Sequence, residues 1–511
     1  MQIILLFGLV GVAYTAYLIL RILFAPLRNV PGPFLARFTN VWYLFQVHTG
    51  HVERKNCELH ETYGKYNLLE GPVVRYGPSR YSFNSPEAIK TIYGHSTQFA
   101  KSSFYDAFMV PGVWNVFTER NIKFHASLRR EFQATYTMSN LVNFEPYVDQ
   151  CARLFDQRLH EVSVAGVTID IGHWLQCYAL DVISQITFAE RLGTLESGDD
   201  IGGVMKALED SFYYASTVGI YGEVHPHLFA VVSFLDRLGV GGKGKGLGYV
   251  IKVAQEKINA YKAKPAAIYE ETQDGSEEFV SKFMKQNATN PERFTTNHIL
   301  NGCAMNIAAG SDTTGISLSA VLYYLLKNPG CMDKLREEII TFRNDGKLSE
   351  SPTYKQSQDM PYLQAVLKEA LRLHPAVGQP LERVVPEGGA TIAGKYFAQG
   401  TIVGVNCWAA HRNKAVWGQD ADEFKPDRWL TKDADKLSAM NRNWIPFGAG
   451  SRTCLGRHIS MLEMCKLVPR IIRDFDFELA DGLEADWKTV AYWFVKPSNF
   501  RVRVRIRSTV P

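Results

Sequence analysis

One segment near the C-terminus limits the possible folds and functions of this chain more than any other. Residues 447–456 read Phe-Gly-Ala-Gly-Ser-Arg-Thr-Cys-Leu-Gly. Glycines before and after Cys454 let the backbone come close, so that several amide N–H groups can point at the sulfur. A helical pattern that begins near Leu455 adds the positive end of a helix dipole. Both features favour a thiolate at this position.

The other cysteines lack such surroundings, and we expect them to be inert, small buried hydrophobes. They are Cys57, Cys151, Cys177, Cys303, Cys331, Cys407 and Cys465. There is no C-x-x-C pair and no even cysteine framework, so neither a zinc site nor a disulfide scaffold is predicted. This cysteine usage fits a protein exposed to the cytosol.

The N-terminus carries a predicted transmembrane anchor at residues 3–24. No charged residue occurs from Ile3 to Leu20, and a helix of about 20 residues spans the roughly 30 Å hydrocarbon layer. A cleaved signal peptide is the alternative, but no basic region precedes the apolar run and no small-x-small site follows it. Arg21, Arg28 and Arg37 follow the span, so the positive-inside rule places the rest of the chain in the cytosol.

Residues 25–40 form a predicted proline-rich elbow, because Pro31-Gly32-Pro33 cannot continue a helix. Residues 41–511 are then expected to form one catalytic domain, since no repeat and no shift in composition divides them. With 46% hydrophobic and 21% charged positions, the chain can bury a large core. The net charge of +4 is evenly spread, which argues against a nucleic-acid partner.

The pattern of apolar residues predicts a mostly α protein with a small β-sheet region. Residues 72–84 read as a hairpin, and residues 501–507 alternate as a strand. Helical patterns cover about 140–160, 174–189, 296–327, 331–343, 360–373 and 455–473. Gly239–Lys245 matches the spacing of a phosphate loop, but Gly246 stands where such a loop needs Ser or Thr. A surface loop is therefore the favoured interpretation there.

The segment 447–456 resembles the haem-binding loop of the cytochrome P-450 superfamily, F-x-x-G-x-R-x-C-x-G, at every fixed position. The resemblance implies the cytochrome P-450 fold and haem b as cofactor, with Cys454 as the axial thiolate ligand of the iron. It further implies that Arg452 pairs with a haem propionate, and that Phe447, Gly448 and Gly456 belong to the cofactor-binding loop. In this family the thiolate donates electron density that favours O–O cleavage.

Two more matches to the family concern structure rather than catalysis. Glu369 and Arg372 form an E-x-x-R pair three residues apart on one predicted helix face. The segment 426–429, Pro-Asp-Arg-Trp, resembles the family's P-x-R-F. By this resemblance, Arg428 would join Glu369 and Arg372 in a buried triad behind the haem loop.

Residues 309–314, Ala-Gly-Ser-Asp-Thr-Thr, resemble the family's A-G-x-D-T-T within the long helix 296–327. Glycine costs about 1 kcal/mol relative to alanine in a helix, and consecutive threonines are poor helix formers. On these residues alone, a bent core helix with back-bonded threonines would be favoured. Next to the cysteine loop, we expect a catalytic role instead: Gly310 makes room for oxygen, Thr313 positions oxygen and water, and Asp312 supplies protons.

Three further cofactor contacts follow from the resemblance. Segment 125–129 stands where the family has W-x-x-x-R, with His125 in place of Trp, so Arg129 and His125 are predicted propionate contacts. Arg383 stands where many members supply another. The likeness extends from Pro31 onward and is typical of microsomal members, with segments similar to fungal pisatin-demethylase-like enzymes. Lys65–Gly71 is an extra segment, either a surface loop or a retained intron.

The substrate pocket is expected beneath residues 99–117 and 205–245, against the central helix and Val377–Leu381. These stretches predict an apolar chamber with aromatic walls. The aromatic candidates are Phe104, Tyr105, Phe108, Trp114, Phe117, Phe212, Tyr213, Tyr214 and Tyr221. No nicotinamide or flavin fingerprint occurs, so another protein must supply electrons. The resemblance implies the membrane-bound NADPH-cytochrome P-450 reductase, with Lys123, Arg129, Arg130, Lys414 and Arg442 as candidate basic contacts.

The sequence thus predicts a monooxygenase that inserts oxygen from O₂ into an apolar small molecule, in fungal secondary metabolite biosynthesis. Its predicted location is the endoplasmic reticulum membrane, single-pass, with the catalytic domain facing the cytosol. The alternatives are a haem-thiolate isomerase or dehydratase that does not activate O₂, and a demethylase that detoxifies xenobiotics. A catalytically silent, anchored ligand-binding protein is a further alternative from another class.

Overall fold

The structure is a computed structural model that describes residues 27–64, 73–238, 246–263, 277–484 and 486–507. The predicted anchor at 3–24, the extra segment Lys65–Gly71 and the sequence Gly239–Lys245 lie outside these residues. The limits predicted for the anchor, the elbow and the catalytic domain therefore stay predictions.

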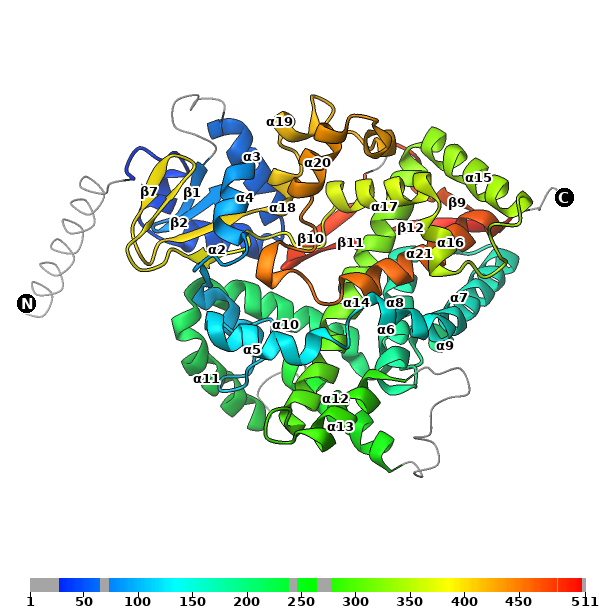
Figure 1. Cartoon of the computed structure of the whole chain (residues 1–511), viewed down its shortest axis with the longest axis horizontal. Coiled ribbons are helices and arrows are strands. Elements are labelled where there is room, and N and C mark those ends of the chain that lie inside the picture. The colour runs from blue at the N-terminus through cyan, green and yellow to red at the C-terminus, as the bar shows by residue number, and fades with distance from the viewer. Residues whose placement is uncertain (1–26, 65–72, 239–245, 264–276, 485, 508–511) are drawn as a thin grey trace, which may run out of the picture.

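Helices make up most of the described chain (Figure 1), which confirms the mostly α fold. The helices of the first half are α2 (Val41–His48), α3 (Val52–Gly64), α4 (Pro86–Tyr93), α5 (Ile122–Gln133), α6 (Met138–Leu141), α7 (Glu145–Ala165), α8 (Ile171–Phe188), α9 (Thr194–Ser197), α10 (Val204–Val218), α11 (His225–Arg237) and α12 (Leu247–Lys262). Those of the second half are α13 (Phe279–Thr289), α14 (Thr296–Lys327), α15 (Pro329–Asn344), α16 (Tyr354–Gln358), α17 (Pro361–Leu373), α18 (Cys407–Ala410), α19 (Lys414–Trp417), α20 (Ala434–Asn443) and α21 (Arg457–Asp474).

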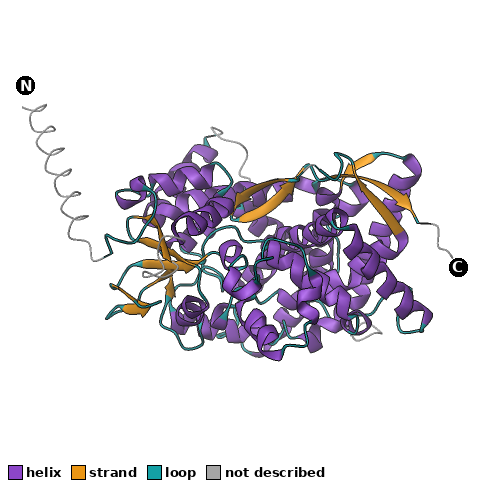
Figure 2. Cartoon of the chain, turned by 90° about the horizontal axis from the view of Figure 1, so that it is seen from above, coloured by secondary structure: helices purple, strands orange, loops and turns teal. Residues whose placement is uncertain are grey.

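The strands form small sheets beside the helices (Figure 2). The five-stranded sheet has the order β1 (Val73–Gly77), β2 (Arg80–Phe83), β8 (Ile402–Val405), β5 (Arg383–Val384) and β3 (Ala100–Lys101). A second sheet joins β4 (Thr168–Asp170), β12 (Arg501–Ile506) and β9 (Phe475–Leu479), and two hairpins pair β6 (Ala390–Ile392) with β7 (Lys395–Phe397) and β10 (Lys488–Tyr492) with β11 (Phe494–Ser498). The predicted hairpin at 72–84 and the strand at 501–507 are confirmed.

The central element is α14, which matches the predicted helix 296–327. Its first turn is closed by a capping box, in which Nδ1 of His298 accepts from the backbone N–H of Thr295 at 3.0 Å. The helix ends before Asn328–Pro329, because proline disfavours helix in the residue that precedes it. Most of its residues are buried, and it packs along α8. It is therefore a rigid support for groups on its surface.

By length and composition alone, the helical run from Ile201 to Leu235 could cross a membrane. The backbone of this run leaves helical geometry at Gly202 (φ 68°) and at Tyr221 (φ −120°, ψ 54°). These breaks divide it into η4 (Ile201–Gly203), α10, η5 (Gly219–Val224) and α11. The run is thus a bent element, and parts of α10 and α11 cover the interior cavity described below.

Candidate active site

The loop that carries Cys454 is held in shape by its own backbone. The amide of Cys454 donates to the carbonyl oxygen of Phe447 at 2.9 Å. Between them lies the 3-10 turn η8 (Gly450–Arg452), and α21 begins at Arg457. The sulfur therefore lies just before the N-terminal end of a long, largely buried helix, as the sequence predicted.

Gly450 packs this loop directly against α4. Its φ of +64° is in the left-handed region that glycine adopts readily. A Cβ at this position would come within 1.7 Å of the carbonyl oxygen of Tyr93. Gly448 also has a positive φ, +71°, but the atom nearest to a Cβ there would be 3.9 Å away. Glycine is required at 448 by conformation alone, and at 450 by conformation and space together.

Cys454 differs from the other cysteines in the described part of the chain. Its side chain is accessible, whereas the others are buried or intermediate. The sulfur opens on an interior cavity rather than on the outer surface, so it is accessible although protein surrounds it. Burial raises the pKa of the thiol, while backbone N–H groups of Gly456 and Arg457 and the charge of Arg129 lower it. The groups expected to favour a thiolate are present, and desolvation opposes them.

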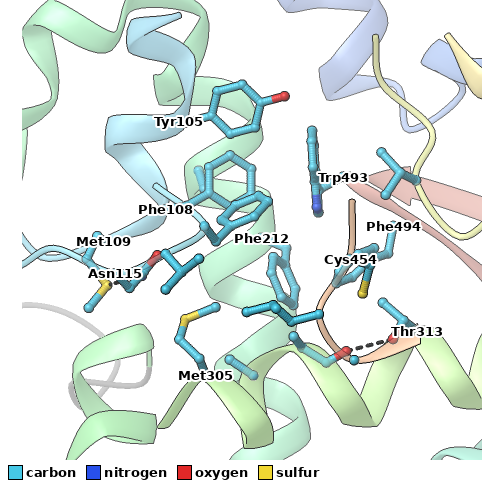
Figure 3. Close-up of a pocket in the computed structure, with 18 of the residues that line it drawn as sticks. Tyr105, Phe108, Met109, Asn115, Phe212, Met305, Thr313, Cys454, Trp493 and Phe494 are labelled. Carbon is cyan, nitrogen blue, oxygen red and sulfur yellow. Dashed lines mark hydrogen bonds between the residues drawn. The ribbon is translucent and has the colours of Figure 1, made fainter. Parts of the chain in front are cut away.

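The cavity has a volume of about 760 Å³ (Figure 3). Residues 101–117 and 208–233, α14 and the segment Val377–Leu381 contribute to its lining, as predicted. Of the predicted aromatic residues, Tyr105, Phe108, Trp114, Phe117, Phe212 and Tyr214 line it, and Phe104, Tyr213 and Tyr221 do not. Such a largely apolar lining suits an apolar ligand.

Basic side chains gather along the same cavity. His125, Arg129, Arg383 and Arg452, which the sequence analysis singled out, all line it. The acidic residue among its described lining is Asp210, which accepts a hydrogen bond from Lys206 at 2.6 Å. The lining therefore carries a surplus of positive charge without matching carboxylates. Two carboxylates of a bound molecule would balance it.

Burial and mutual repulsion affect the ionisation of these groups. Burial lowers the pKa of Arg452 to about 10, and the charge of Arg383 acts in the same direction. Burial also lowers the pKa of His125 to about 3, assisted by the charge of Arg452. Arg452 is fixed by its hydrogen bond to the carbonyl oxygen of Glu119 at 2.6 Å. An anion among these groups would relieve their repulsion.

Lys101 is a cavity residue that the sequence analysis did not assign to the cofactor. Its ammonium donates to the carbonyl oxygen of Phe117 and lies 4.2 Å from the ring centre of Tyr105. The pairing of β3 with β5 places it opposite Arg383, although like charges in that position are unfavourable. Burial lowers the pKa of Lys101 well below its usual range. The signal in the sequence was a lone lysine in a strand-like segment, which does not reveal a partner 282 positions away.

The residues present fit haem b. A thiol opens on an apolar cavity, and cations without carboxylate partners stand along its wall. Cys454 would hold the iron, and Arg129, Arg383 and Arg452 would hold the propionates. These assignments stay predictions, as do those for Phe447, Gly448 and Gly456, which also line the cavity.

Two of the predicted catalytic residues reach the cavity from α14. The hydroxyl of Thr313 lines it and donates to the carbonyl oxygen of Ala309 at 2.6 Å. Gly310 also borders the cavity, but a Cβ there would come within 2.7 Å of Ile183 on α8. Gly310 therefore permits the close contact between α14 and α8, a role that the sequence did not reveal. That it also makes room for oxygen stays a prediction.

Asp312, the predicted source of protons, does not line the cavity. One carboxylate oxygen accepts from the amide of Gln176 on α8 and lies 3.4 Å from the ammonium of Lys496 on β11. The other oxygen has no partner among the described residues. Burial raises the pKa of Asp312, and the charge of Lys496 lowers it. Asp312 adjoins Thr313 in the chain but faces α8 and β11.

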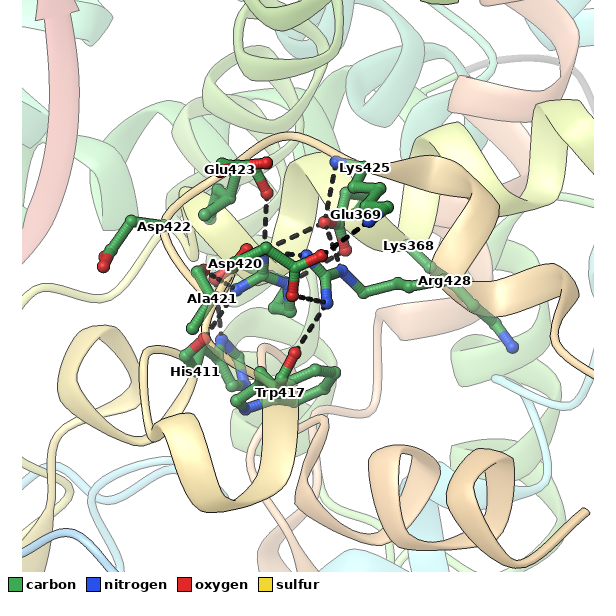
Figure 4. A network of polar contacts seen from close by, with 12 residues as sticks. Lys368, Glu369, His411, Trp417, Asp420, Ala421, Asp422, Glu423, Lys425 and Arg428 are labelled. Carbon is green, nitrogen blue, oxygen red and sulfur yellow. Dashed lines mark hydrogen bonds and ion pairs between the residues drawn. The ribbon is translucent and has the colours of Figure 1, made fainter. Parts of the chain in front are cut away.

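The structure brings Glu369, Arg372 and Arg428 together in a buried network (Figure 4). Arg372 donates to both carboxylate oxygens of Glu369 at 2.9 Å, and Arg428 donates to one of them at 2.7 Å. The indole N–H of Trp429 and the backbone N–H of Lys425 complete the carboxylate's partners, at 2.9 and 3.0 Å. Buried charges are tolerated when they are paired in this way.

His411 links this network to the cysteine loop, and the sequence analysis missed it. Its Nδ1 lies 3.0 Å from the carbonyl oxygen of Arg372, and its Nε2 accepts from the backbone N–H of Ile445 at 3.0 Å. Burial lowers the pKa of His411 to about 3, so the ring is neutral with its proton on Nδ1. We call Glu369, Arg372, His411 and Arg428 the polar scaffold. It ties α17 to the start of the loop that carries Cys454.

Trp493, at the tip of the β10–β11 hairpin, is a further cavity residue that the sequence analysis missed. Its φ is +89°, a conformation that costs a bulky residue about 1–3 kcal/mol. Its carbonyl oxygen accepts from the amide of Gly378 at 2.8 Å. Four rings surround the indole with centroids 5.0–5.9 Å away, and we call them the aromatic cage: Phe104, Tyr105, Phe108 and Phe117. In the sequence, Trp493 is marked only by the three consecutive aromatic residues Tyr492-Trp493-Phe494, which match no motif.

A sequence model of the family Cytochrome P450 matches residues 31–498 of this chain. The chain belongs to the cytochrome P450 family. The chain is accordingly an oxidoreductase of the haem-thiolate monooxygenase class, with haem b as its cofactor, and it adopts the P450 fold. The family also implies O₂, a small-molecule substrate and a redox partner.

Curated relatives agree with this assignment over nearly the whole chain. A pisatin demethylase of Fusarium vanettenii is 39% identical over 477 residues, which cover 93% of this chain and 88% of the relative. A second pisatin demethylase of that fungus is 37% identical over 507 residues, covering 98% and 94%. A cytochrome P450 monooxygenase of Aspergillus terreus is 37% identical over 473 residues, covering 88% and 90%.

Proposed function

We propose that this chain is a membrane-anchored P450 that uses O₂ and reductase-supplied electrons to oxidise an apolar small molecule in fungal secondary metabolite biosynthesis. One observation carries the proposal: the thiol of Cys454 and the hydroxyl of Thr313 open on the same apolar cavity of about 760 Å³. A bound haem would supply the centre at which O₂ is activated. The residues of the chain then decide which molecule is oxidised and how protons arrive.

Hydroxylation and demethylation are the reactions that this cavity supports best. The relatives named pisatin demethylase favour removal of a methyl group. In that reaction one oxygen atom of O₂ enters a C–H bond of an O-methyl group, and the other leaves as water with two electrons and two protons. The resulting hemiacetal separates into an alcohol and formaldehyde. Aromatic walls suit a planar substrate that carries such a group.

The side chains around the cavity divide the work. Thr313 directs its O–H to Ala309, which leaves its oxygen able to accept a hydrogen bond from water or substrate. Asp312 is proposed to supply protons, and its contact with Lys496, whose side chain is 27% exposed, lies between it and solvent. The apolar lining keeps bulk water from the reacting carbon.

Electrons are proposed to come from NADPH-cytochrome P-450 reductase. Four of the predicted basic contacts, Lys123, Arg130, Lys414 and Arg442, are exposed, which suits attraction of an acidic partner. Arg129 is half-buried and lines the cavity, so we assign it to the cofactor rather than to the reductase.

Exposed apolar side chains support contact with the endoplasmic reticulum membrane. On α11, Val231 is 54% and Phe234 60% exposed, and Leu238 follows at 60%. On η1 (Phe34–Arg37) and α2, Phe34 is 73% and Phe45 60% exposed. Both groups lie at the left of Figure 1. Large exposed apolar surfaces mark sites of protein or membrane contact.

The ferrous carbon-monoxide spectrum of the haem-loaded protein tests the proposal. We expect the red-shifted Soret band of a thiolate-ligated haem, and its loss in Cys454→Ala. Cys151→Ala is the matched control, because this buried cysteine on α7 does not line the cavity. An unshifted band in the unaltered protein would contradict the proposal. Substrate turnover without NADPH would favour the isomerase instead.

Flotation with phosphatidylcholine vesicles tests the membrane contact separately. A chain that begins at residue 27 should bind the vesicles, and Val231→Ser with Phe234→Ser should reduce binding severalfold. A control with Val164→Ser, 73% exposed on α7, should leave binding unchanged. Equal binding of all three proteins would contradict a membrane role for α11.

A further inference from the structure

The strained tip of the β10–β11 hairpin points to a specific role for Trp493. A bulky residue with positive φ persists only when its surroundings stabilise it, and such strain gathers at functional sites. The other non-glycine residues with positive φ in the described chain are Ser96, Ala189, Ala393 and Asn499, all much smaller. A tryptophan is therefore kept where a smaller residue would be easier to place.

The contacts of Trp493 fix its ring without using its polar group. The aromatic cage surrounds the indole, with Phe108 nearest at 5.0 Å between centroids. No hydrogen bond joins the indole N–H to another residue of the described chain. A tryptophan N–H can only donate, and it usually finds a partner when it is buried. The ring is 3% exposed and lines the cavity.

The direction of the N–H places it in the part of the cavity that contains Cys454. Figure 3 shows the indole nitrogen pointing toward the space between Phe212 and Cys454. Two other polar groups of the wall already have partners: the Thr313 hydroxyl donates to Ala309, and the Tyr214 hydroxyl contacts Nδ1 of His225 at 3.0 Å. Trp493 thus offers a fixed donor in a largely apolar chamber, and such isolated groups orient ligands.

We infer that Trp493 determines specificity by donating a hydrogen bond to an ether or carbonyl oxygen of a planar aromatic substrate. This inference rests on the proposed function and names its substrate class. The aromatic cage holds the donor in place, so little conformational freedom is lost when the substrate binds. The bond sets which edge of the substrate is turned toward Cys454.

Aryl imidazoles provide a test that does not need the natural substrate. Their imidazole nitrogen binds the haem iron, so the Soret shift reports binding. We compare 1-phenylimidazoles that carry a methoxy or an ethyl group at ring position 2, 3 or 4, because the members of each pair differ mainly in one acceptor oxygen. At one position or more, the unaltered protein should bind the methoxy compound about fivefold to tenfold more tightly, the effect of one hydrogen bond.

Trp493→Phe keeps an aromatic ring and removes the donor, so this preference should disappear. Phe212→Leu is the control: it changes the same wall without a polar atom, and it should weaken both members of a pair alike. Because Trp493→Phe could disturb the cage, a second variant replaces Trp493 with 3-benzothienylalanine, which has sulfur in place of N–H. It should lose the preference as well.

Two results would overturn the inference: no methoxy preference at any position in the unaltered protein, or a preference that survives both replacements at 493. Failure of the proposed function has a different signature. In that case the protein lacks the red-shifted carbon-monoxide band, whereas failure of the inference alone leaves the band and imidazole binding intact.

Discussion

The polar scaffold and the interior cavity both adjoin the loop that carries Cys454, but they differ in whether their polar groups have partners within the protein. In the scaffold, both oxygens of Glu369 have donors, and Arg372 and Arg428 also bind backbone carbonyl oxygens. In the cavity, the indole N–H of Trp493 has no hydrogen-bond acceptor among the described residues, and several cations have no carboxylate partner there. The scaffold is complete by itself and fixes the position of the sulfur. The cavity holds polar groups that can still bind a ligand.

The largest effect should come from removing the charge at the centre of the scaffold. Glu369→Gln removes the counter-charge of the buried Arg372 and leaves Arg428 only its longer contact with Asp420, at 3.3 Å. We expect a loss of about 3–5 kcal/mol in the free energy of unfolding. Urea denaturation followed by circular dichroism measures it. Lys425→Ala, which removes the exposed partner of Asp420, should cause no measurable change. Equal stability of both variants would contradict a central role for Glu369.

The next prediction separates the two reasons for glycine in the loop that carries Cys454, which are the positive φ and the lack of space for a Cβ. Gly450→Ala places a methyl group on the carbonyl oxygen of Tyr93 and also strains φ, which should cost about 3 kcal/mol. Gly448→Ala meets only the conformational penalty, about 1 kcal/mol. The readouts are unfolding by urea and the amount of haem retained after gel filtration. If both variants lose the same free energy of unfolding, the close approach to α4 does not contribute to stability.

Acid should weaken the scaffold through His411. Its pKa in the folded protein is lowered to about 3, so the unfolded chain binds a proton near pH 6.5 while the folded chain does not. The stabilisation is complete above pH 6.5 and decreases as the pH falls toward 3. Between pH 6.5 and pH 5 it should decrease by about 2 kcal/mol.

His411→Gln cannot take up this proton, so its stability should depend less on pH over that interval. Chemical denaturation at several pH values compares the two proteins. The variant should be less stable at pH 7, because the buried amide of Ile445 loses its acceptor. Parallel pH profiles for the two proteins would show that His411 does not titrate on unfolding.

The smallest effect on stability is expected from a substitution in the interior cavity. Phe108→Leu removes one ring of the aromatic cage but keeps an apolar side chain, and it should cost about 1 kcal/mol. Its effect on the binding of aromatic ligands should be larger, about tenfold, because Trp493 loses its nearest ring. Thermal unfolding and ligand titration measure the two effects. A large loss of stability without a change in binding would reverse the contrast between cavity and scaffold.

The sequence was sufficient for features that are local along the chain. The loop around Cys454 and the pair Glu369–Arg372 are each contained in a few residues, and the helix 296–327 shows its apolar pattern directly. The structure places these elements as expected. The walls of the cavity were predictable in part, since the segments 99–117 and 205–245 are rich in aromatic residues and six of the nine aromatic candidates line it.

The residues that sequence reasoning missed depend on contacts between distant parts of the chain. His411 links Arg372 to Ile445 through its two ring nitrogens, and the sequence around position 411 does not predict these contacts. Lys101 meets Arg383 only through strand pairing. Trp493 is a tip residue whose cage comes from residues 104–117. A lone histidine, lysine or tryptophan has no pattern of its own, so only the fold reveals its partners.

The ribbon formed by β10 and β11 touches two very different parts of the molecule. Its tip bears Trp493, and Lys496 on the same strand as Phe494 reaches the buried carboxylate beside Thr313. A displacement of the tip by a poorly fitting compound would be transmitted to that carboxylate within three residues. We therefore expect that substitutions at the tip that change the preferred substrate also change how tightly electron use is coupled to substrate oxidation. With a poorly fitting substrate, more of the electrons would then reduce O₂ to hydrogen peroxide.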